Sequence, residues 1–213
     1  MIKIENTHID NIARAVYSAR NAMNSWDKSD SDIENDVLGE KDLALAKKLI
    51  KAGTDHSKFM RMINVTCDIT APLYWIAEHD TYKVGTTRNS CSFMHKGLAR
   101  PFEFEDFSFC IYDIADYTLD EGEKGLMERY IYRSIIEALN ELRAKYIIGK
   151  DEDIFALIRQ LLPSGYNQRY TWQANYQVLR NIYHARRFHR LQEWKDFCSW
   201  IETLPYSELI TEV

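Results

Sequence analysis

The sequence predicts an α+β fold that is mostly helical, with a small central sheet of antiparallel or mixed strands. Apolar residues recur at helical spacing in most segments, whereas residues 62–70 alternate between apolar and polar side chains. Apolar residues make up 46% of the 213 positions, and only 8 are Gly and 4 are Pro. This composition excludes collagen-like and disordered chains and predicts a single domain, residues 1–213, with a large core.

The first quarter of the chain predicts two helices joined by a loop. Apolar residues at helical spacing indicate a helix over residues 12–26. The polar residues 27–39 then predict an exposed loop. A second helix is expected over residues 40–52, because the next residue, Gly53, is of a type that commonly ends helices.

The alternating segment begins the second quarter. Residues 62–70 predict a half-buried strand, followed by a short helix or turn at 74–79. Residues 80–100 are polar and only weakly periodic, and an irregular segment of that length in a compact domain is often functional. The aromatic-rich residues 102–112 predict another strand.

The second half of the chain is predicted to be helical. A capping box at residues 118–121 marks the start of its first helix, and Pro163 ends its second. The helices are expected at residues 123–146, 152–162, 170–189 and 192–203.

Charge and hydropathy exclude several classes of protein. The net charge of −5 argues against a protein that binds nucleic acid through a basic surface. There is no apolar run of about 18 residues that would span a membrane. The N-terminus has no signal-peptide core, so a cytoplasmic location is expected. The scattered cysteines are expected to be reduced and mostly buried thiols: Cys67, Cys91, Cys110 and Cys198.

Arg186 lies on the apolar side of the helix expected over residues 170–189, whereas Arg180 and Arg187 are expected to face solvent. A guanidinium in such surroundings is costly unless a negative group meets it. Two interpretations stay open: an internal salt bridge, or a bound carboxylate or phosphate held by the Arg186 fork. The residues sharing its side are Asn175, Leu179, Ile182 and His189.

Other candidates are weaker. Arg159 lies among apolar residues and poses the same question, although a surface position is the simpler interpretation. Residues 86–92 are rich in hydroxyl and amide side chains, which form turns and also bind anions. The histidines, including His56 beside Ser57, have no metal-ligand spacing, so no metal site is predicted.

Three patches of residues resemble one known family. His56, a strand and then residues 70–74 are similar to its H-E-T-P-F…A-P segment. Gln192-Glu193-Trp194 resembles its A-Q-W-E near the C-terminal helix. Apart from the three patches, Ala19-Arg20 resembles its opening A-A-R helix. Further residues fall in register with its R-x-x-L-P…N…N-x-x-x-x-R pattern. This family is the flavin-dependent thymidylate synthases (ThyX), and the residues in register are Arg159, Pro163, Asn175, Asn181 and Arg186.

The ThyX signature RHRxxSxNExSxRY is only partly present in residues 81–94. Lys83 stands for the third basic residue and Thr86 for the first serine. With one inserted residue, Asn89 and Ser92 align with the asparagine and serine of NExS. The first arginine, the histidine and the glutamate of the signature are replaced by other residues.

The resemblance implies a ThyX-like fold and a set of ligands. Family members use FAD, methylenetetrahydrofolate and NADPH to methylate dUMP, without a covalent enzyme nucleophile, at sites between the subunits of a homotetramer. The resemblance implies dUMP contacts for Arg159, Arg186, Ser92 and Glu78. It implies cofactor contacts for His56, Ser57, Lys83, Thr86, Asn89, Asn175, Asn181 and His189.

Three functions therefore stay open. The first is an FAD-dependent thymidylate synthase or a close variant that modifies dUMP. The second is a flavin-free ThyX-like protein that binds a nucleotide as a sensor or regulator. The third is an oligomeric interaction protein that reuses the scaffold, in which Arg159 and Arg186 pair with internal carboxylates.

Overall fold

The structure is a computed structural model that describes residues 2–93, 97–108 and 121–212, with the backbone alone for residues 121–130. Within it the chain divides into two compact units. The first unit contains residues Ala71–Ala77 and Ser90–Arg169, and the second contains Ile2–Thr70, Glu78–Asn89 and Tyr170–Val213.

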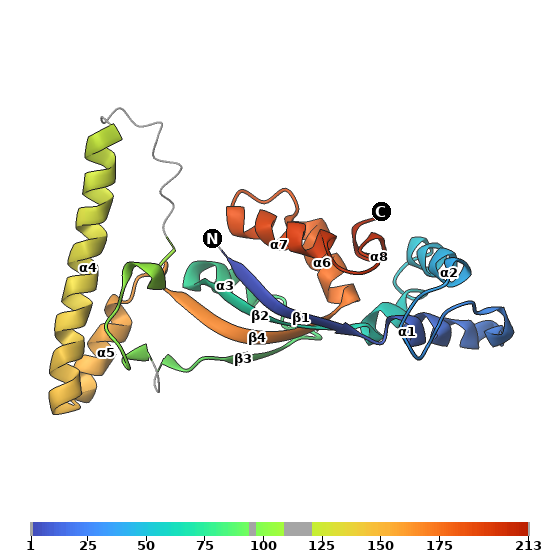
Figure 1. Cartoon of the computed structure of the whole chain (residues 1–213), viewed down its shortest axis with the longest axis horizontal. Helices are drawn as coiled ribbons and strands as arrows, with labels where there is room; N and C mark the ends of the chain where they lie inside the picture. Colours follow the sequence, from blue (N-terminus) through green and yellow to red (C-terminus); the bar gives the residue numbers. More distant parts are fainter. Residues whose placement is uncertain (1, 94–96, 109–120, 213) are drawn as a thin grey trace. The chain divides into compact units, whose positions relative to one another are not determined.

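A four-stranded sheet has the order β1-β2-β4-β3 (Figure 1). β1 pairs with β2 in antiparallel orientation, with Ile9 opposite Val65, and the register shifts between Glu5 and His8 around Asn6, whose φ is 52°. The small sheet among many helices confirms the predicted α+β class. The strands are β1 (Lys3–Asp10), β2 (Asn64–Pro72), β3 (Thr87–Ser90) and β4 (Asn167–Asn175).

The core of the second unit lies between this sheet and the C-terminal helices α6 (Tyr176–Arg186) and α7 (Gln192–Glu202). β2 buries every second side chain, as its alternation predicted, and β4 does the same. The ring of Trp172 in β4 lies 6.0 Å from that of Phe197 in α7. The buried residues of the two strands are Val65, Cys67, Ile69, Ala71, Pro72, Tyr170, Trp172 and Ala174.

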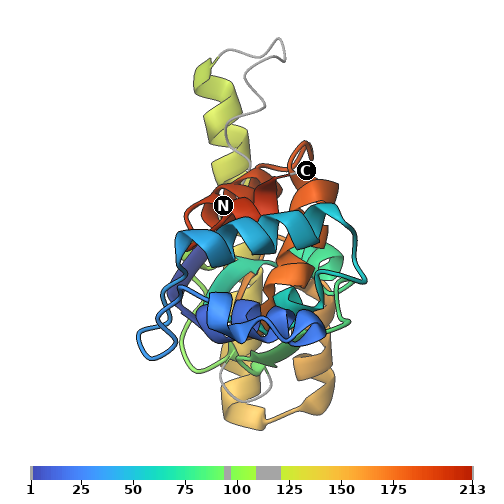
Figure 2. The ribbon, with the colours of Figure 1, turned by 90° about the vertical axis from the view of Figure 1, so that its right-hand side faces the viewer.

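Helices α1 (Ile12–Ala19) and α2 (Glu40–Lys51) lie next to one another in the second unit (Figure 2). The helix expected over residues 12–26 is shorter than predicted. Its end tightens into two 3₁₀ turns, because Asn24 adopts a left-handed conformation with φ 47° between them. Those turns are Arg20–Met23 and Trp26–Lys28.

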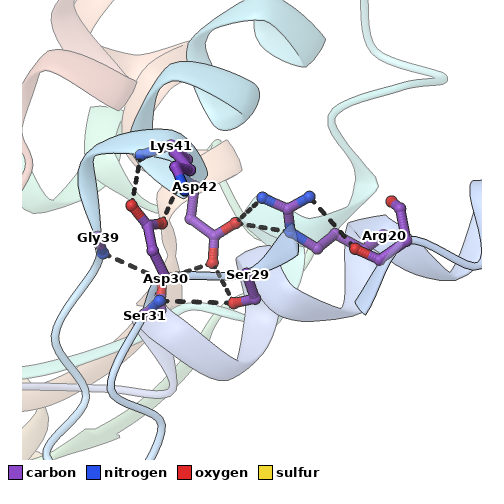
Figure 3. Close-up of polar contacts among 8 residues, drawn as sticks. Arg20, Ser29, Asp30, Ser31, Gly39, Lys41 and Asp42 are labelled. Atoms are coloured by element: carbon purple, nitrogen blue, oxygen red, sulfur yellow. Dashed lines mark hydrogen bonds and ion pairs between the residues drawn. The ribbon is translucent and has the colours of Figure 1, made fainter. Parts of the chain in front are cut away.

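Most residues of the segment 27–39 are exposed, and polar contacts hold part of it against the neighbouring helices (Figure 3). Asp42, in the first turn of α2, is fully buried, and its carboxylate accepts hydrogen bonds from the Nε and Nη2 atoms of Arg20. The hydroxyls of Ser29 and Ser31 donate to its other oxygen. Asp30 accepts from the backbone N–H groups of residues 41 and 42 and so caps α2. This polar network joins the end of α1, the segment 27–39 and α2.

The first unit is built on the helical hairpin of α4 (Glu121–Gly149) and α5 (Glu152–Leu161), which lie side by side (Figure 1). Asp151 caps α5 by accepting from the N–H groups of its first turn. Leu139 and Ile158 are buried between the helices. Both helices confirm the predictions made from the spacing of apolar residues. The capping box expected at residues 118–121 lies almost wholly outside the described residues.

Several sequence predictions need correction. The prediction of a strand over residues 102–112 is wrong for the described part of that range, because Phe104–Asp106 is a 3₁₀ helix. Residues 109–112 lie outside the described part of the chain. The helix expected over 170–189 begins only at Tyr176, since the preceding residues form β4. Residues 80–100 contain β3, and β1 was not predicted at all.

The remaining elements are α3 (Leu73–His79), α7 and α8 (Glu208–Thr211), with a 3₁₀ helix at Lys58–Met62.

The described cysteines fit the prediction of free thiols. Cys67 and Cys198 are buried and Cys91 is exposed, while Cys110 lies outside the described residues. Burial raises the pKa of the Cys67 thiol to about 12 and that of Cys198 to about 11. Among the helices described, none is both long and apolar enough to cross a membrane.

Candidate functional site

Arg186 is the centre of a polar and aromatic cluster at the C-terminal end of α6. Its Nη1 lies 3.1 Å from Oε2 of Glu78, and its Nε donates to the hydroxyl of Tyr82 at 2.8 Å. The guanidinium lies over the rings of Tyr82 and Trp194, at 5.5 and 4.7 Å from their centroids. His189 completes the cluster, with Nε2 at 3.8 Å from the same oxygen of Glu78. We call these five residues the Arg186 cluster.

The partner of Arg186 is an internal carboxylate, which was one of the two interpretations left open. Glu78 Oε2 also accepts a hydrogen bond from Nε1 of Trp194 at 2.9 Å, so the carboxylate is held from two sides. The ion pair is accessible to solvent, because 22% of the Arg186 side chain and 37% of the Glu78 side chain are exposed. The Nη2 of Arg186 makes no hydrogen bond to any residue of the described part of the chain. The cluster therefore offers a donor to a ligand.

A cavity of about 410 Å³ adjoins the cluster and shares Tyr82 with it. Trp172 and Tyr82 supply aromatic walls, and Lys83 and Arg88 supply positive charge. Its volume lies within the range of small-molecule sites. A cavity with aromatic faces and cations suits a planar ligand that carries anionic groups. We call it the loop cavity; its lining residues are His79, Asp80, Tyr82, Lys83, Thr86, Arg88 and Trp172.

The turn that carries Lys83 is fixed by local contacts. The hydroxyl of Thr86 donates to the carbonyl of Tyr82 at 3.0 Å. Gly85 has φ +76°, a conformation that favours glycine, and a Cβ there would lie 3.3 Å from Nδ2 of Asn175. Arg88 is held by Asp80, with Nη1 at 2.7 Å from Oδ1. Of the two cations in the loop cavity, Lys83 is therefore the one without a carboxylate partner among the described residues.

His79 forms the buried floor of the loop cavity and is only 2% exposed. Its ring lies 4.7 Å from Trp172, and its Nδ1 lies 3.1 Å from the hydroxyl of Tyr170. Burial, with a smaller contribution from the charge of Arg88, lowers the pKa of His79 to about 3. His79 is therefore neutral near pH 7 and adds no charge to the cavity.

The lowered pKa of His79 predicts a loss of stability in mild acid. Below its ordinary pKa of 6.5 the unfolded chain takes up a proton at His79, whereas the folded chain does so only near pH 3. Above pH 6.5 the histidine is mostly neutral in both states, so it hardly changes the free energy of unfolding. Between pH 7 and pH 5 the free energy of unfolding falls by about 2 kcal/mol, because protonation of His79 stabilises the unfolded chain. Urea unfolding of wild type and His79→Gln at both pH values measures this. Equal pH dependence of the two proteins would contradict the prediction.

Four other residues proposed as cofactor contacts in the second unit have local structural roles or are exposed. Asn175 caps α6 by accepting from the N–H of residue 178. Asn175 is the last residue of β4, so the prediction that it shares a helix face with Arg186 is wrong. Asn181 accepts from Gln177 at 3.0 Å, and the hydroxyl of the buried Ser57 lies 3.4 Å from the amide oxygen of the same glutamine. His56 is exposed in a turn. None of these four residues lines the loop cavity, and their cofactor roles stay predictions.

Arg180 and Arg187, expected to face solvent, both make contacts. Arg180 donates to the carbonyls of residues 210 and 212, and Arg187 lies 4.8 Å from the ring of Phe188. Arg180 therefore connects α6 to the C-terminal helix α8. Of the two arginines in α6, Arg186 is the one that pairs with a carboxylate among the described residues.

Two predicted substrate contacts belong to the first unit. Arg159 is exposed in the last turn of α5, and its guanidinium has no hydrogen-bond or ion-pair partner among the residues described. Ser92 is exposed and lines a separate cavity of about 190 Å³ with Tyr166, Asn167 and Gln168. Asn89, by contrast, lies in the edge strand β3 of the second unit and is exposed. The convergence of Arg159 and Arg186 on one anion stays a prediction.

Sequence reasoning missed several residues of this site. Tyr82 is the residue that replaces the histidine of the ThyX signature, yet its hydroxyl binds Arg186 and its ring lines the loop cavity. Arg88 and His79 were not proposed either. Trp194 belongs to the patch Gln192-Glu193-Trp194 that resembles the family, but neither Trp194 nor Trp172 was given a role. His79, Tyr82 and Arg88 lie in or next to the polar segment 80–100, which the sequence singles out, whereas Trp172 and Trp194 are distant from it in sequence.

Two solved structures resemble this chain over its whole length. The crystal structure of flavin-dependent thymidylate synthase ThyX from Helicobacter pylori, complexed with FAD and dUMP, is 15% identical to it. The match covers 99% of this chain and 98% of that chain, with a TM-score of 0.68. The chain shares the ThyX fold. A second structure of ThyX from Helicobacter pylori with FAD and dUMP, at 2.31 Å resolution, gives 15% identity, a TM-score of 0.67 and coverage of 100% and 98%.

The ThyX fold confirms the fold expected from the three sequence patches. No protein-family model matches the sequence, and neither does any protein of curated function. FAD and dUMP are the ligands of the Helicobacter pylori proteins.

Proposed function

We propose that this chain is a ThyX-like enzyme that binds dUMP and FAD and methylates dUMP to dTMP, using methylenetetrahydrofolate and NADPH. One observation carries the proposal. Residues 78–88, most of which align with the ThyX signature, form an aromatic and positively charged cavity that adjoins Arg186 through Tyr82. The family resemblance and the shared fold support the same function.

The residues of the site fit a nucleotide and a flavin. Of the aromatic residues that line the loop cavity, the half-buried Tyr82 is the one suited to stack on a planar ring, because Trp172 is only 3% exposed. Lys83 and the hydroxyl of Thr86 can meet phosphate oxygens, and the free Nη2–H of Arg186 can donate to the nucleotide. FAD, when bound, would supply the hydride for the reaction. The protein's own contribution is binding and orientation, since no covalent nucleophile is expected.

A homotetramer with sites between subunits is part of the proposal. Large apolar side chains are exposed on the helical hairpin of the first unit, which supports self-association. Ile131 is 47%, Ile148 88% and Leu161 51% exposed. Arg159 and Ser92 would then complete a site with residues of another copy. Light scattering on the purified protein measures the assembly, and a monomer at all concentrations would contradict this part.

The decisive experiment is an absorbance spectrum of the purified protein after incubation with FAD and gel filtration, followed by calorimetric titration with dUMP. We expect a yellow protein that retains FAD, binds dUMP and releases tritium from [5-³H]dUMP when methylenetetrahydrofolate and NADPH are added. A colourless protein that takes up no FAD would overturn the flavin-dependent activity.

A second candidate is a flavin-free ThyX-like protein that binds a nucleotide as a sensor or regulator. The observation that favours it is that two arginines of the site already have internal carboxylates. Asp80 holds Arg88 and Glu78 holds Arg186. This candidate predicts dUMP binding by calorimetry without any uptake of FAD, which separates it from the first.

Lys83→Ala is expected to weaken dUMP or FAD binding by about tenfold at low ionic strength, because Lys83 is the cation of the loop cavity that has no carboxylate partner among the residues described. Calorimetry at 20 and 300 mM salt measures the effect, which should shrink as salt rises. Lys58→Ala is a matched control that removes the same charge outside the cavity. Equal affinities of wild type and Lys83→Ala would show that this lysine does not bind the ligand.

A further inference from the structure

We infer that Glu78 is a specificity-determining residue: its carboxylate balances the charge of Arg186, so that this position accepts an uncharged hydrogen-bonding group and disfavours an anionic one. The inference rests on the proposed function, because it concerns the ligand of the same site. It differs from the interpretation, based on the apolar neighbours of Arg186, that this residue holds a bound carboxylate or phosphate.

Geometry holds the carboxylate in place. Glu78 Oε2 is 3.1 Å from Nη1 of Arg186 and 2.9 Å from Nε1 of Trp194. Glu78 lies in the last turn of α3, and Trp194 lies in the first turn of α7, so both groups are carried by helices. Displacing Glu78 would cost both contacts. An incoming anion therefore cannot simply replace the carboxylate, as it could replace a loosely held side chain.

Charge decides what can bind beside this pair. A phosphate or carboxylate that reached the free Nη2–H of Arg186 would lie within several ångströms of the Glu78 carboxylate. Attraction to the guanidinium would then be offset by repulsion from Glu78 at nearly the same distance. A neutral acceptor, such as a carbonyl oxygen, gains the hydrogen bond without that repulsion. Anionic groups are better placed at Lys83, which has no carboxylate partner in the described structure.

Glu78→Gln tests the inference, because glutamine keeps the shape and the acceptor oxygen for Arg186 and Trp194 but removes the charge. Glu202→Gln is the matched control. It removes one negative charge from the second unit, and its glutamine can still accept from Tyr183, which donates to Glu202 at 2.7 Å. Both variants are titrated with sodium phosphate and with uridine at one ionic strength, after near-ultraviolet circular dichroism has shown native packing.

We expect Glu78→Gln to bind phosphate about tenfold more tightly than wild type and Glu202→Gln. Uridine affinity should stay the same in all three proteins. Adding Arg186→Gln to Glu78→Gln should abolish the gain. Equal phosphate affinity of Glu78→Gln and Glu202→Gln, or a gain that survives in the double variant, would overturn the inference.

Titration of wild type with dUMP separates this inference from the proposed function. If dUMP binds and Glu78→Gln gains no phosphate affinity, the inference fails and the function stands. If dUMP does not bind but the gain for phosphate is seen, the function fails and the inference stands. Absence of both results overturns both.

Discussion

Arg20→Ala is expected to lower the free energy of unfolding by about 3–5 kcal/mol, because it leaves the carboxylate of Asp42 buried without its cation. Asp42 is fully buried and Arg20 is only 6% exposed. Among the described residues, the hydroxyls of Ser29 and Ser31 would be the side-chain donors that remain to stabilise the charge after the substitution. The loss should also loosen the segment 27–39, because the network in Figure 3 joins it to both helices. Urea unfolding at pH 7 measures the change.

Lys47→Ala is the control for this experiment. Lys47 also forms an ion pair in the second unit, at 2.9 Å from Glu212, but both side chains are substantially exposed. Exposed pairs contribute about 0–1 kcal/mol, so this variant should stay close to wild type. If Arg20→Ala is no more destabilised than Lys47→Ala, the buried pair does not hold the two helices together.

Arg186→Ala should weaken dUMP binding by about 2–5 kcal/mol, which is thirtyfold or more. Two effects add. The nucleotide loses the donor at Nη2, and the carboxylate of Glu78 is left as an unbalanced negative charge in the site of an anionic ligand. Trp194 would remain as the hydrogen-bond donor to Glu78. Calorimetric titration of the variant with dUMP measures the loss.

Arg187→Ala is the matched control for Arg186→Ala. Its guanidinium packs on Phe188 and Tyr183 rather than on the Arg186 cluster. It removes the same charge at the next position in the chain and should change dUMP affinity by less than about threefold at moderate salt. Similar losses in both variants would mean that general positive charge, and not the placement of Arg186, governs binding.

Local patterns predicted the parts of the fold that depend on local sequence. The alternation in β2 and the apolar spacing in α4, α5 and α7 each match an observed element. β1 escaped prediction because it is largely exposed and forms through pairing with β2, with Ile9 opposite Val65. When a strand forms by pairing with a segment distant in sequence and stays largely exposed, its own sequence has no clear alternating pattern from which it could be predicted.

β4 was missed for a different reason. Tyr170, Trp172 and Ala174 alternate with polar residues, but the helical stripe of the next segment was extended back over them. The boundary is set by Asn175, whose side chain caps α6, and a strand that leads into a capped helix reads locally like one longer helix.

The candidate site was predicted in part. The need of Arg186 for a negative partner followed from its apolar neighbours, but the identity of that partner did not. Glu78 is 108 residues away in sequence, and only the fold brings α3 to α6. Tyr82 was likewise read as a lost signature residue, since its contact with Arg186 spans 104 positions.

The most direct test of the account is a calorimetric titration of the wild-type protein with dUMP, in the presence and absence of FAD. The account predicts saturable binding of dUMP, and a protein that also retains FAD would fulfil the proposed enzymatic role. No detectable heat with millimolar dUMP under either condition, from protein with native circular dichroism, would contradict the claim that the Arg186 cluster and the loop cavity form a nucleotide site.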